Sequence, residues 1–239
     1  MDWLVAVSGF TRRCLVDFLG VPQERVSVIY HGIDTDHFQP MSDARTRLAA
    51  WYDMQSTCHS HDLLYVGNEQ PRKNLGVLLS ALTKLKSHGY RLRLIKVGGA
   101  GGKHWRRQFL NRVHQLELNG DVIVVDAVAE ADLPIFYSAA DLYVTPSLIE
   151  GFGLPVLEAM ACGTPVVCSN AGSLPEVVGS AAKLVEPRAP GSLAEAIASV
   201  LDDDQLRSRM SERGLVQAAK FTWERTARET VAVYKQVCG

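Results

Sequence analysis

Two glutamates flank a glycine-containing loop in a place where side chains could bind a sugar. Glu150 directly precedes the loop Gly151–Gly153, and Glu158 lies in the helix-like run that follows. The apolar run Leu142–Val144 comes before them, so the order is strand, glycine loop and helix. Carboxylates accept hydrogen bonds from sugar hydroxyls, and we expect the loop to fold both of them toward one mouth. The spacing leaves an alternative open, in which Glu158 only complements the helix dipole and Glu150 is solvated.

The same loop could also bind a phosphate. Gly151 and Gly153 lack a Cβ, so a ligand can come close to the backbone there. Pro155 is tolerated in a first helical turn, and Gly163 ends the helix. That first turn offers unpaired N–H groups and the positive end of the helix dipole to an anion.

A second candidate segment, Gly67–Asn74, carries a basic pair at the start of a helix. It follows the strand-like run Leu63–Val66. Lys73 can neutralise a diphosphate leaving group as a point charge, and Arg72 can bind one through two parallel hydrogen bonds. Cations at a helix start oppose the helix dipole, which favours a function for the pair. The structural alternative is a solvated basic pair.

Two more loops are expected at the same edge of the fold. Gly98 and Gly99 begin a glycine run after the strand-like segment 91–97, where a nucleotide could approach the backbone; a flexible turn is the alternative. The loop Asp126–Val128 follows the strand-like segment 122–125. Both loops come directly after strands, and ligands of open α/β sheets bind beyond the carboxyl ends of the strands.

The pattern along the chain predicts an α/β fold with a doubly wound parallel sheet and helices on both faces. Short apolar strand-like runs alternate with helix-like runs from residue 62 onward. The expected strands of this sheet are residues 63–66, 91–97, 122–125, 142–144, 165–169 and 182–185. The expected helices between and after them are residues 75–86, 104–118, 132–139, 156–161, 193–201, 205–220 and 223–237, with a short turn near residues 175–178.

The segment PSLIEGFGLPVLEAMACGTPVV resembles the signature of the family 4 glycosyltransferases of the GT-B fold, and the likeness extends over most of the chain. The resemblance implies that Glu150 contacts the transferred sugar and that Glu158 holds the ribose of the donor nucleotide. It also implies that Gly151, Phe152, Gly153 and Leu154 form the donor-binding loop.

The resemblance bears on the basic segment as well. In the family an arginine commonly follows the glycine, and a lysine comes five positions later. Here Asn68 takes the arginine position after Gly67, while Lys73 matches the lysine. Arg72 is a weaker match, since neighbours on a helix face different directions. Some related enzymes share the sequence P-R-K-N, which favours GDP-mannose as donor and a UDP-hexose second.

Two other positions are compared with the family. The loop with Val128 lies where the family's backbone contacts the base, but Asp126 replaces the usual glycine, and this blurs the choice of nucleotide. Glu176, in SLPEVVG, also matches the family; an acid at a short helix start is an equal alternative.

The expected domain limits follow from the same likeness. Residues 1–40 resemble the end of a GT-B N-terminal domain whose beginning is absent, with an expected strand at residues 3–7, a helix at 11–19 and a strand at 25–30. Residues 41–61 form a linker, 62–220 the donor-binding domain and 221–239 a crossover helix that packs on the first domain. An N-terminal domain supplied by another chain, or self-association, is therefore the expected protein partner.

Composition excludes several classes of protein. The 239 residues carry a net charge of −1 and 47% hydrophobic residues, which argues against nucleic-acid binding and for an ordinary globular core. Five scattered cysteines without a C-x-x-C pattern indicate reduced thiols and a cytoplasmic protein, with peripheral membrane contact as an option. The sequence Cys58-His59-Ser60-His61 lacks a second ligand cluster, so we expect no metal and no cofactor. No apolar run is long enough for a transmembrane helix.

The resemblance to the family implies the donor-binding portion of a retaining hexosyltransferase, with mannose as the first choice of sugar and a glycan or lipid-linked acceptor. The proposed catalytic residues are Glu150, Lys73 and Arg72. A non-catalytic nucleotide-sugar binding subunit is the first alternative. A sugar-nucleotide epimerase of the same architecture is the second, and the Glu150–Glu158 pattern argues against it.

Overall fold

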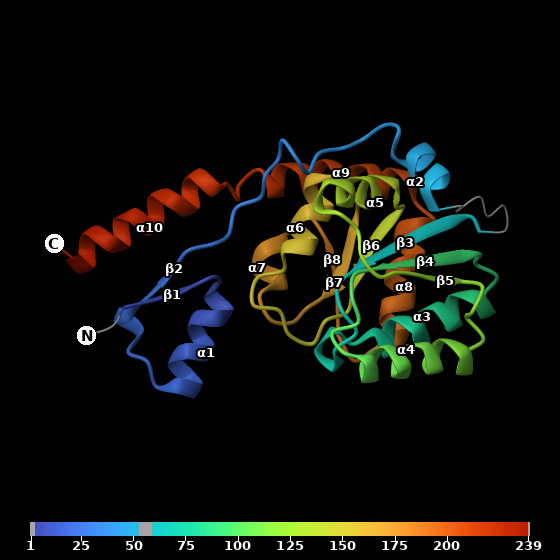
Figure 1. Cartoon of the computed structure of the whole chain (residues 1–239), viewed down its shortest axis with the longest axis horizontal. Coiled ribbons are helices and arrows are strands. Elements are labelled where there is room, and N and C mark those ends of the chain that lie inside the picture. Colours follow the sequence, from blue (N-terminus) through green and yellow to red (C-terminus); the bar gives the residue numbers. More distant parts are fainter. Residues whose placement is uncertain (1–2, 53–58, 239) are drawn as a thin grey trace.

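The large sheet has the strand order of a doubly wound α/β domain. The computed structural model describes residues 3–52 and 59–238, and in them the order is β5-β4-β3-β6-β7-β8, with every pair parallel (Figure 1). The strands are β3 (His61–Val66), β4 (Leu92–Val97), β5 (Val122–Val125), β6 (Leu142–Thr145), β7 (Val166–Ser169) and β8 (Lys183–Val185). The order reverses between β3 and β6, so ligands are expected beyond the carboxyl ends of these two strands. The predicted fold class is confirmed.

The two strands at the reversal point are paired only near their beginnings. β3 and β6 are in register through Leu63 with Leu142 and Leu64 with Tyr143. By contrast, β3 and β4 are paired along all of β3, from His61 to Val66. The ends of β3 and β6 are therefore free to diverge, and the loops that follow them face each other.

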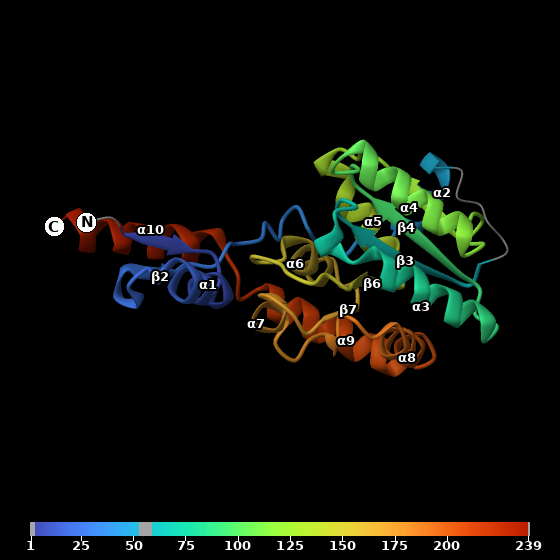
Figure 2. The ribbon, with the colours of Figure 1, turned by 90° about the horizontal axis from the view of Figure 1, so that it is seen from below.

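Helices cover both faces of the sheet (Figures 1 and 2). Leu63 and Tyr65 of β3 belong to one apolar cluster and Leu64 to the other, as expected for alternating side chains of a buried strand. The first cluster is covered by α3 (Leu75–Ser87), α4 (Lys103–Gln115) and α8 (Pro190–Leu201). The second is covered by α2 (Ala44–Tyr52), α5 (Leu133–Ala139), α6 (Leu154–Ala161) and α7 (Leu174–Val178). The helix α9 (Asp204–Ala218) contributes Met210 to one cluster and Ala218 to the other.

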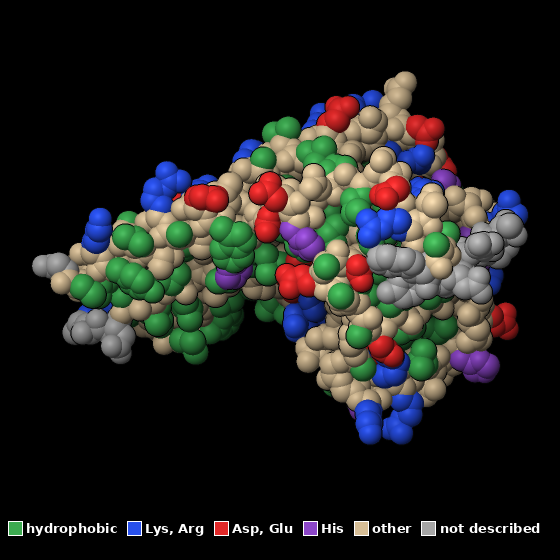
Figure 3. All heavy atoms as spheres, turned by 45° about the horizontal axis from the view of Figure 1, so that its top comes forward, with side chains coloured by type: hydrophobic (Ala, Val, Ile, Leu, Met, Phe, Trp, Pro, Cys, Tyr) green, Lys and Arg blue, Asp and Glu red, His purple; other side chains and the backbone are tan. Residues whose placement is uncertain are grey.

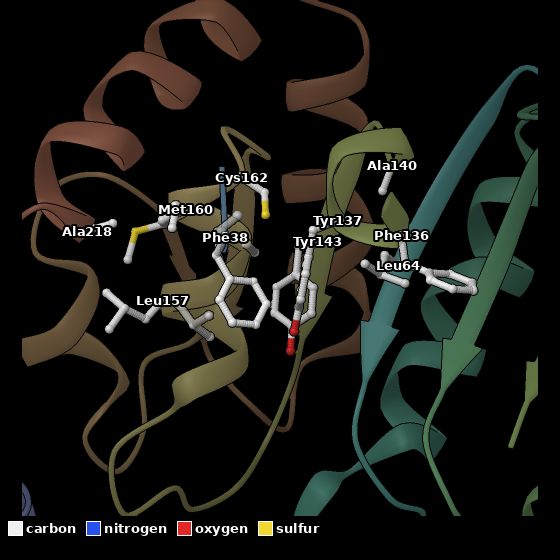
Figure 4. Close-up of a cluster of buried hydrophobic side chains, with 14 of the residues drawn as sticks. Phe38, Leu64, Phe136, Tyr137, Ala140, Tyr143, Leu157, Met160, Cys162 and Ala218 are labelled. Atoms are coloured by element: carbon white, nitrogen blue, oxygen red, sulfur yellow. The ribbon is translucent and has the colours of Figure 1, made fainter. Parts of the chain in front are cut away.

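Aromatic side chains fill the core between the sheet and α5 and α6. The rings of Phe38, Tyr137 and Tyr143 lie next to one another in the middle of this cluster (Figure 4). The ring centre of Tyr137 lies 6.2 Å from that of Phe38 and 5.8 Å from that of Tyr143. Phe38 belongs to the segment that enters the domain, so the crossover from the first residues is anchored in this core.

A small lobe is attached to this domain. It contains the parallel strands β1 (Leu4–Ala6) and β2 (Val26–Val28) with α1 (Gly9–Leu19) between them. The last helix, α10 (Trp223–Cys238), runs away from the large sheet toward the same end of the molecule, where both termini lie (Figure 1). Ile33 donates its backbone N–H to the carbonyl of Phe221, so the two chain segments that leave the large domain are joined there.

Most predicted elements are confirmed with shifted ends, and four details differ. The predicted turn near residues 175–178 is the helix α7, because Ser173 and Pro175 begin a helical turn there. The predicted strand 25–30 is shorter, and a short 3-10 turn, Gln23–Arg25, precedes it. The basic pair lies in a separate 3-10 turn, Pro71–Lys73, before α3. The predicted linker 41–61 contains α2, and residues 53–58 of it are outside the described residues. The domain limits stay predictions.

Candidate functional site

The basic pair and Glu150 meet at the carboxyl ends of β3 and β6. The Lys73 Nζ donates to Glu150 Oε1 at 2.6 Å, and the Arg72 guanidinium lies 3.4 Å from Glu150 Oε2. Ser147 donates its hydroxyl to the same Oε1 at 2.7 Å. The side chains of Lys73 and Glu150 are only 11% and 13% exposed, whereas that of Arg72 is 44% exposed. The structure therefore places all three predicted catalytic residues in one cluster at the reversal point.

Backbone contacts hold the two loops of this cluster together. Asn74 has a left-handed conformation, φ 58°, between the 3-10 turn and α3. Its side-chain amide donates to the carbonyls of Pro146, at 2.9 Å, and Pro187, at 2.6 Å. The N–H of Leu148 donates to the carbonyl of Arg72 at 2.7 Å. Loops after β3, β6 and β8 are thus fixed relative to one another, and the cations are presented on a rigid base.

Arg72 and Lys73 face the same carboxylate although they are neighbours. The prediction that they would point in different directions assumed a regular helix. The pair instead ends a 3-10 turn, and α3 begins only at Leu75 after the left-handed Asn74. Both side chains can therefore reach Glu150, and the secondary place given to Arg72 is corrected by the geometry.

The predicted glycine positions Gly67 and Gly98 lie against each other at the carboxyl ends of β3 and β4. A Cβ on Gly98 would lie 2.9 Å from the carbonyl oxygen of Gly67, and Gly98 has φ +113°. A Cβ on Gly67 would lie 2.7 Å from the Tyr65 hydroxyl. A larger residue at position 98 would push the two loops apart, and one at position 67 would displace the Tyr65 side chain. The next glycine, Gly99, is exposed and has open space beside its Cα.

A buried group of charged residues supports this glycine loop, and the sequence analysis missed it. Lys96 lies in the middle of β4 with a fully buried side chain. Its ammonium donates to Glu69 Oε1 at 2.6 Å, to the carbonyl of Gly99 at 3.3 Å and to the carbonyl of Gly98. Burial lowers the Lys96 pKa, and the Glu69 carboxylate opposes this shift. The signal in the sequence was a lysine inside an otherwise apolar strand, where a charge needs a partner.

Arg106 of α4 extends this group to the surface. Its Nε donates to both carboxylate oxygens of Glu69, and its Nη2 forms an ion pair with Asp126 at 2.5 Å. The hydrogen bond to Arg106 holds the pKa of Asp126 below its ordinary value. Asp126, which stands where the resembling enzymes usually have glycine, is therefore held by an ion pair with α4.

The carbonyls of residues 150–152 accept hydrogen bonds from both the large domain and the small lobe. The Ser173 hydroxyl lies 3.0 Å from the carbonyl of Glu150 and 2.8 Å from that of Phe152, and the Ser173 N–H also donates to Glu150. Thr11 of the small lobe donates its hydroxyl to the carbonyl of Gly151 at 3.2 Å. Gly153 begins α6 with φ 101°. The first turn of α6 therefore follows directly from a loop whose carbonyls are hydrogen-bonded.

Phe152 is buried in the junction between the large domain and the small lobe. Its ring lies 5.2 Å from His31, 6.0 Å from Tyr30 and 5.8 Å from Phe221, measured between ring centres. Only 5% of Phe152 is exposed. Its side chain shapes the loop from behind, so any donor contact at this predicted position belongs to its backbone.

Glu158 lies in a different environment from Glu150, and the described contacts do not join the two. Tyr137 donates its hydroxyl to Glu158 Oε2 at 2.6 Å. Burial raises the pKa of Glu158, and the charge of Glu130 adds to this shift. Together with Leu154, Glu158 lines a hollow of about 400 Å³ beside the crossover residues 32–38. The expectation of one common mouth for the two acids finds no support in these contacts.

The remaining predicted positions border the site. Asn68 accepts the N–H of Gln70 at 3.1 Å and caps its own turn. Val128 packs, half-buried, against the core. Of the Cys58-His59-Ser60-His61 sequence, Cys58 lies outside the described residues, while His59 contacts Asp121 at 3.0 Å. Burial raises the pKa values of the Cys162 and Cys168 thiols to about 12, so neither supplies a thiolate.

A parallel sheet with glycine loops, cations and carboxylates at its reversal point is the arrangement of a doubly wound α/β domain, whose ligands bind at that point. The sequence model of the group 1 glycosyl transferases matches residues 59–216, and that of glycosyltransferase family 4 matches residues 1–37. The chain therefore belongs to the group 1 glycosyltransferases, and the predicted family is confirmed.

Individual relatives show the same likeness. The chain is 36% identical over 234 residues to the O-antigen chain mannosyltransferase B of Escherichia coli, covering 97% of this chain and 60% of that one. It is 35% identical over 251 residues to a D-inositol 3-phosphate glycosyltransferase of a Nocardioides species, covering 98% and 54%. The sucrose-phosphate synthase of Thermosynechococcus elongatus superposes with a TM-score of 0.86 at 29% identity, covering 98% and 57%. The chain thus spans little more than half the length of these proteins.

Proposed function

We propose that this chain is the donor-binding portion of a retaining glycosyltransferase that transfers a hexose from a nucleotide-diphosphate sugar. The observation that carries the proposal is the cluster of Lys73, Arg72 and Glu150 at the reversal point of the sheet. When the bond between the sugar carbon and the diphosphate oxygen breaks, negative charge grows on the diphosphate. Two fixed cations and the N–H groups of the first α6 turn would stabilise that charge.

The three residues have different roles in this scheme. Lys73 and Arg72 bind the departing diphosphate, so we propose that the reaction needs no metal or cofactor. Glu150 fixes both cations and contacts the transferred sugar. Both of its carboxylate oxygens are engaged by cations, and one also accepts the Ser147 hydroxyl, so we assign it a binding role and not that of a nucleophile. The acceptor hydroxyl oxygen then bonds the sugar carbon on the face that the diphosphate leaves, and its proton passes to the departing diphosphate oxygen.

We assign the nucleoside to the Glu158 side of the site. Glu158 lines a hollow of about 400 Å³, and its carboxylate is oriented by the Tyr137 hydroxyl. A carboxylate there can accept two hydrogen bonds from ribose hydroxyls. Val128, in the loop that follows β5, would lie near the base.

The proposed donor is GDP-mannose, with a UDP-hexose as the second choice. The name of the Escherichia coli relative, an O-antigen chain mannosyltransferase, supports mannose. The proposed acceptor is a glycan or a lipid-linked glycan, and the proposed place of action is the cytoplasm or the inner face of a membrane. Among the described helices, none is long and apolar enough to cross a bilayer.

The second candidate function is a nucleotide-sugar binding subunit that transfers nothing by itself. The observation in its favour is that the predicted site residues are all assigned to the donor, while transfer also requires an acceptor held beside it. Donor binding is common to both candidates, and only a transfer assay separates them. The family match argues against an epimerase.

Calorimetric titration with GDP-mannose and UDP-glucose tests the proposal. Replacing Lys73 by Ala should weaken binding by about 1.5–3 kcal/mol, the range for a hydrogen bond to a charged group. The matched control is Lys84→Ala, since Lys84 is exposed on α3, the helix that follows Lys73, and should leave the affinity unchanged. Unchanged affinity in Lys73→Ala would remove this residue from the site, and no binding of either nucleotide by the unmodified chain would refute the proposed function.

A further inference from the structure

Glu176 joins the large domain to the small lobe through three hydrogen bonds. Its carboxylate accepts the backbone N–H of Gly9, the N–H of Phe10 and the Tyr30 hydroxyl, each at 2.9 Å. Gly9 and Phe10 are the first residues of α1, so a carboxylate from α7 caps a helix of the other lobe. This position suits a negative charge, because unpaired N–H groups and the positive end of the helix dipole are found there.

The cap is completed by a residue of α1's own chain segment. Ser8 accepts the N–H of Thr11 at 3.0 Å, and its hydroxyl donates to the Thr11 hydroxyl at 2.9 Å. Ser8 alone therefore satisfies one N–H of the first turn, and Glu176 satisfies two more. Without α7, the N–H groups of Gly9 and Phe10 would lose the acceptor that Glu176 provides.

The other end of α7 holds the donor loop. Ser173 directly precedes α7 and contacts the carbonyls of Glu150 and Phe152. Gly172 lies so close to the loop that a Cβ there would meet the Glu150 N at 2.7 Å. The helix α7 is only five residues long, so one short rigid piece links the loop after β6 to the small lobe.

A direct contact also joins the small lobe to the donor loop. Thr11, whose N–H is capped by Ser8, donates its hydroxyl to the carbonyl of Gly151. Three successive carbonyls of the donor loop, those of residues 150–152, are therefore held either by Ser173 or by the small lobe. A displacement of α1 would therefore act on the donor loop both through the Thr11 contact and through α7.

We propose that Glu176 is a positioning residue that couples the placement of the small lobe to the shape of the donor loop. It acts through α7 and touches no donor atom itself. The proposal rests on the proposed function in one respect only, namely that residues 150–153 bind the donor. It assigns to Glu176 a role in donor affinity and not merely in the stability of α1.

Hydrogen exchange of backbone amides tests the coupling, with Glu176→Gln as the main variant. A glutamine keeps the size but turns one acceptor into a donor, which cannot accept a backbone N–H. Exchange should become about tenfold faster or more at Gly9 and Phe10, since a charge-assisted cap is lost. The coupling predicts faster exchange at residues 150–153 as well, and several-fold weaker binding of GDP-mannose.

Two further variants make the outcome decisive. Glu195→Gln removes an exposed acid of α8 and should change nothing. Tyr30→Phe removes only one of the three hydrogen bonds to Glu176 and should shift both regions in the same direction by less. Faster exchange at Gly9 and Phe10 with an unchanged donor loop would overturn the coupling and leave a local helix cap. If the unmodified chain binds no nucleotide, the proposed function fails, while the exchange measurement still decides the coupling.

Discussion

At the scale of single residues, two glutamates, Glu150 and Glu158, differ because their surroundings differ. Glu150 is surrounded by Lys73, Arg72 and the Ser147 hydroxyl, each of which contacts one of its carboxylate oxygens. Glu158 is mostly enclosed, and its one hydrogen-bond donor among the described residues is the Tyr137 hydroxyl. Burial raises its pKa, so the folded chain resists ionising it. A buried acid kept at some expense to folding is a candidate for a ligand contact.

This difference predicts opposite effects of Glu158→Gln on stability and on binding. The raised pKa of Glu158 means that its contribution to stability is complete below the ordinary carboxyl pKa and is lost as pH rises through the folded-state value. Glu158→Gln should therefore raise the melting temperature at pH 7.5, and the gain should shrink toward pH 4.5. The same change should weaken nucleotide binding, since one ribose acceptor becomes a donor. Melting curves at several pH values, with Glu195→Gln as control, check the first part, and a variant less stable than the parent at pH 7.5 would contradict it.

At the scale of elements, β4 and its loop depend on a charge pair inside the core. Lys96 and Glu69 are both buried; without Glu69 the Lys96 charge would be uncompensated, whereas Glu69 would keep only its contact with Arg106 without Lys96. The three donors of the Lys96 ammonium are used by Glu69 and two loop carbonyls. The loop Gly98–Gly99 thus has a fixed shape because the strand below it carries a cation.

Lys96→Met should destabilise the fold by about 3–5 kcal/mol, the usual range for removing one partner of a buried ion pair. The loss is expected near the lower end, because Arg106 still contacts Glu69. In the double variant Lys96→Met with Glu69→Leu, part of the stability should return, since a buried apolar pair is often as stable as an ionic one. Urea unfolding of the two single variants and the double one measures the coupling, and strictly additive losses would show that the pair is not coupled.

At the scale of the whole molecule, the two parts differ in how well their apolar side chains are covered. The large domain has two extensive buried clusters. The small lobe has neither, and none of the described residues of α1 or α10 is buried. Figure 3 shows hydrophobic side chains gathered on that lobe. The exposed apolar residues of the small lobe are Val5, Phe18 and Leu19. Those of the neighbouring α10 are Trp223, Val231, Tyr234 and Val237. A two-stranded sheet with uncovered faces is marginal in water, so we expect another folded unit to cover it.

The expected result is that the chain alone associates with itself and binds donor without transferring sugar. Light scattering should show a mass that rises with concentration, and Tyr234→Lys should reduce the association. Gln236→Lys adds the same charge on the same helix, away from the stripe of Val231 and Tyr234, and should have less effect. A strict monomer that transfers sugar from labelled donor to an acceptor would contradict this expectation, because transfer requires donor and acceptor to be held together.

The sequence by itself determined the class of fold and the kind and order of most elements, with their ends shifted by a few residues. Strand and helix periodicities are local, so the alternation from His61 to Val185 could be recognised without knowing any contact. Lys73 could also be found, because a cation at a helix start opposes local stability. The glycine positions were accessible for the same reason, since a residue type that weakens a regular element indicates a local constraint.

Only the tertiary structure decided which of these residues meet. Lys73 and Glu150 are 77 residues apart and come together because the strand order reverses between β3 and β6. Arg72 joins them because a left-handed Asn74 separates its turn from α3, and neither the turn type nor the partner is a property of the local pattern. Phe152 turned out to be buried against Tyr30 and His31, and Glu176 turned out to cap a helix 167 residues away. Such contacts depend on the packing of distant segments, and that packing is set by burial of the whole apolar surface at once.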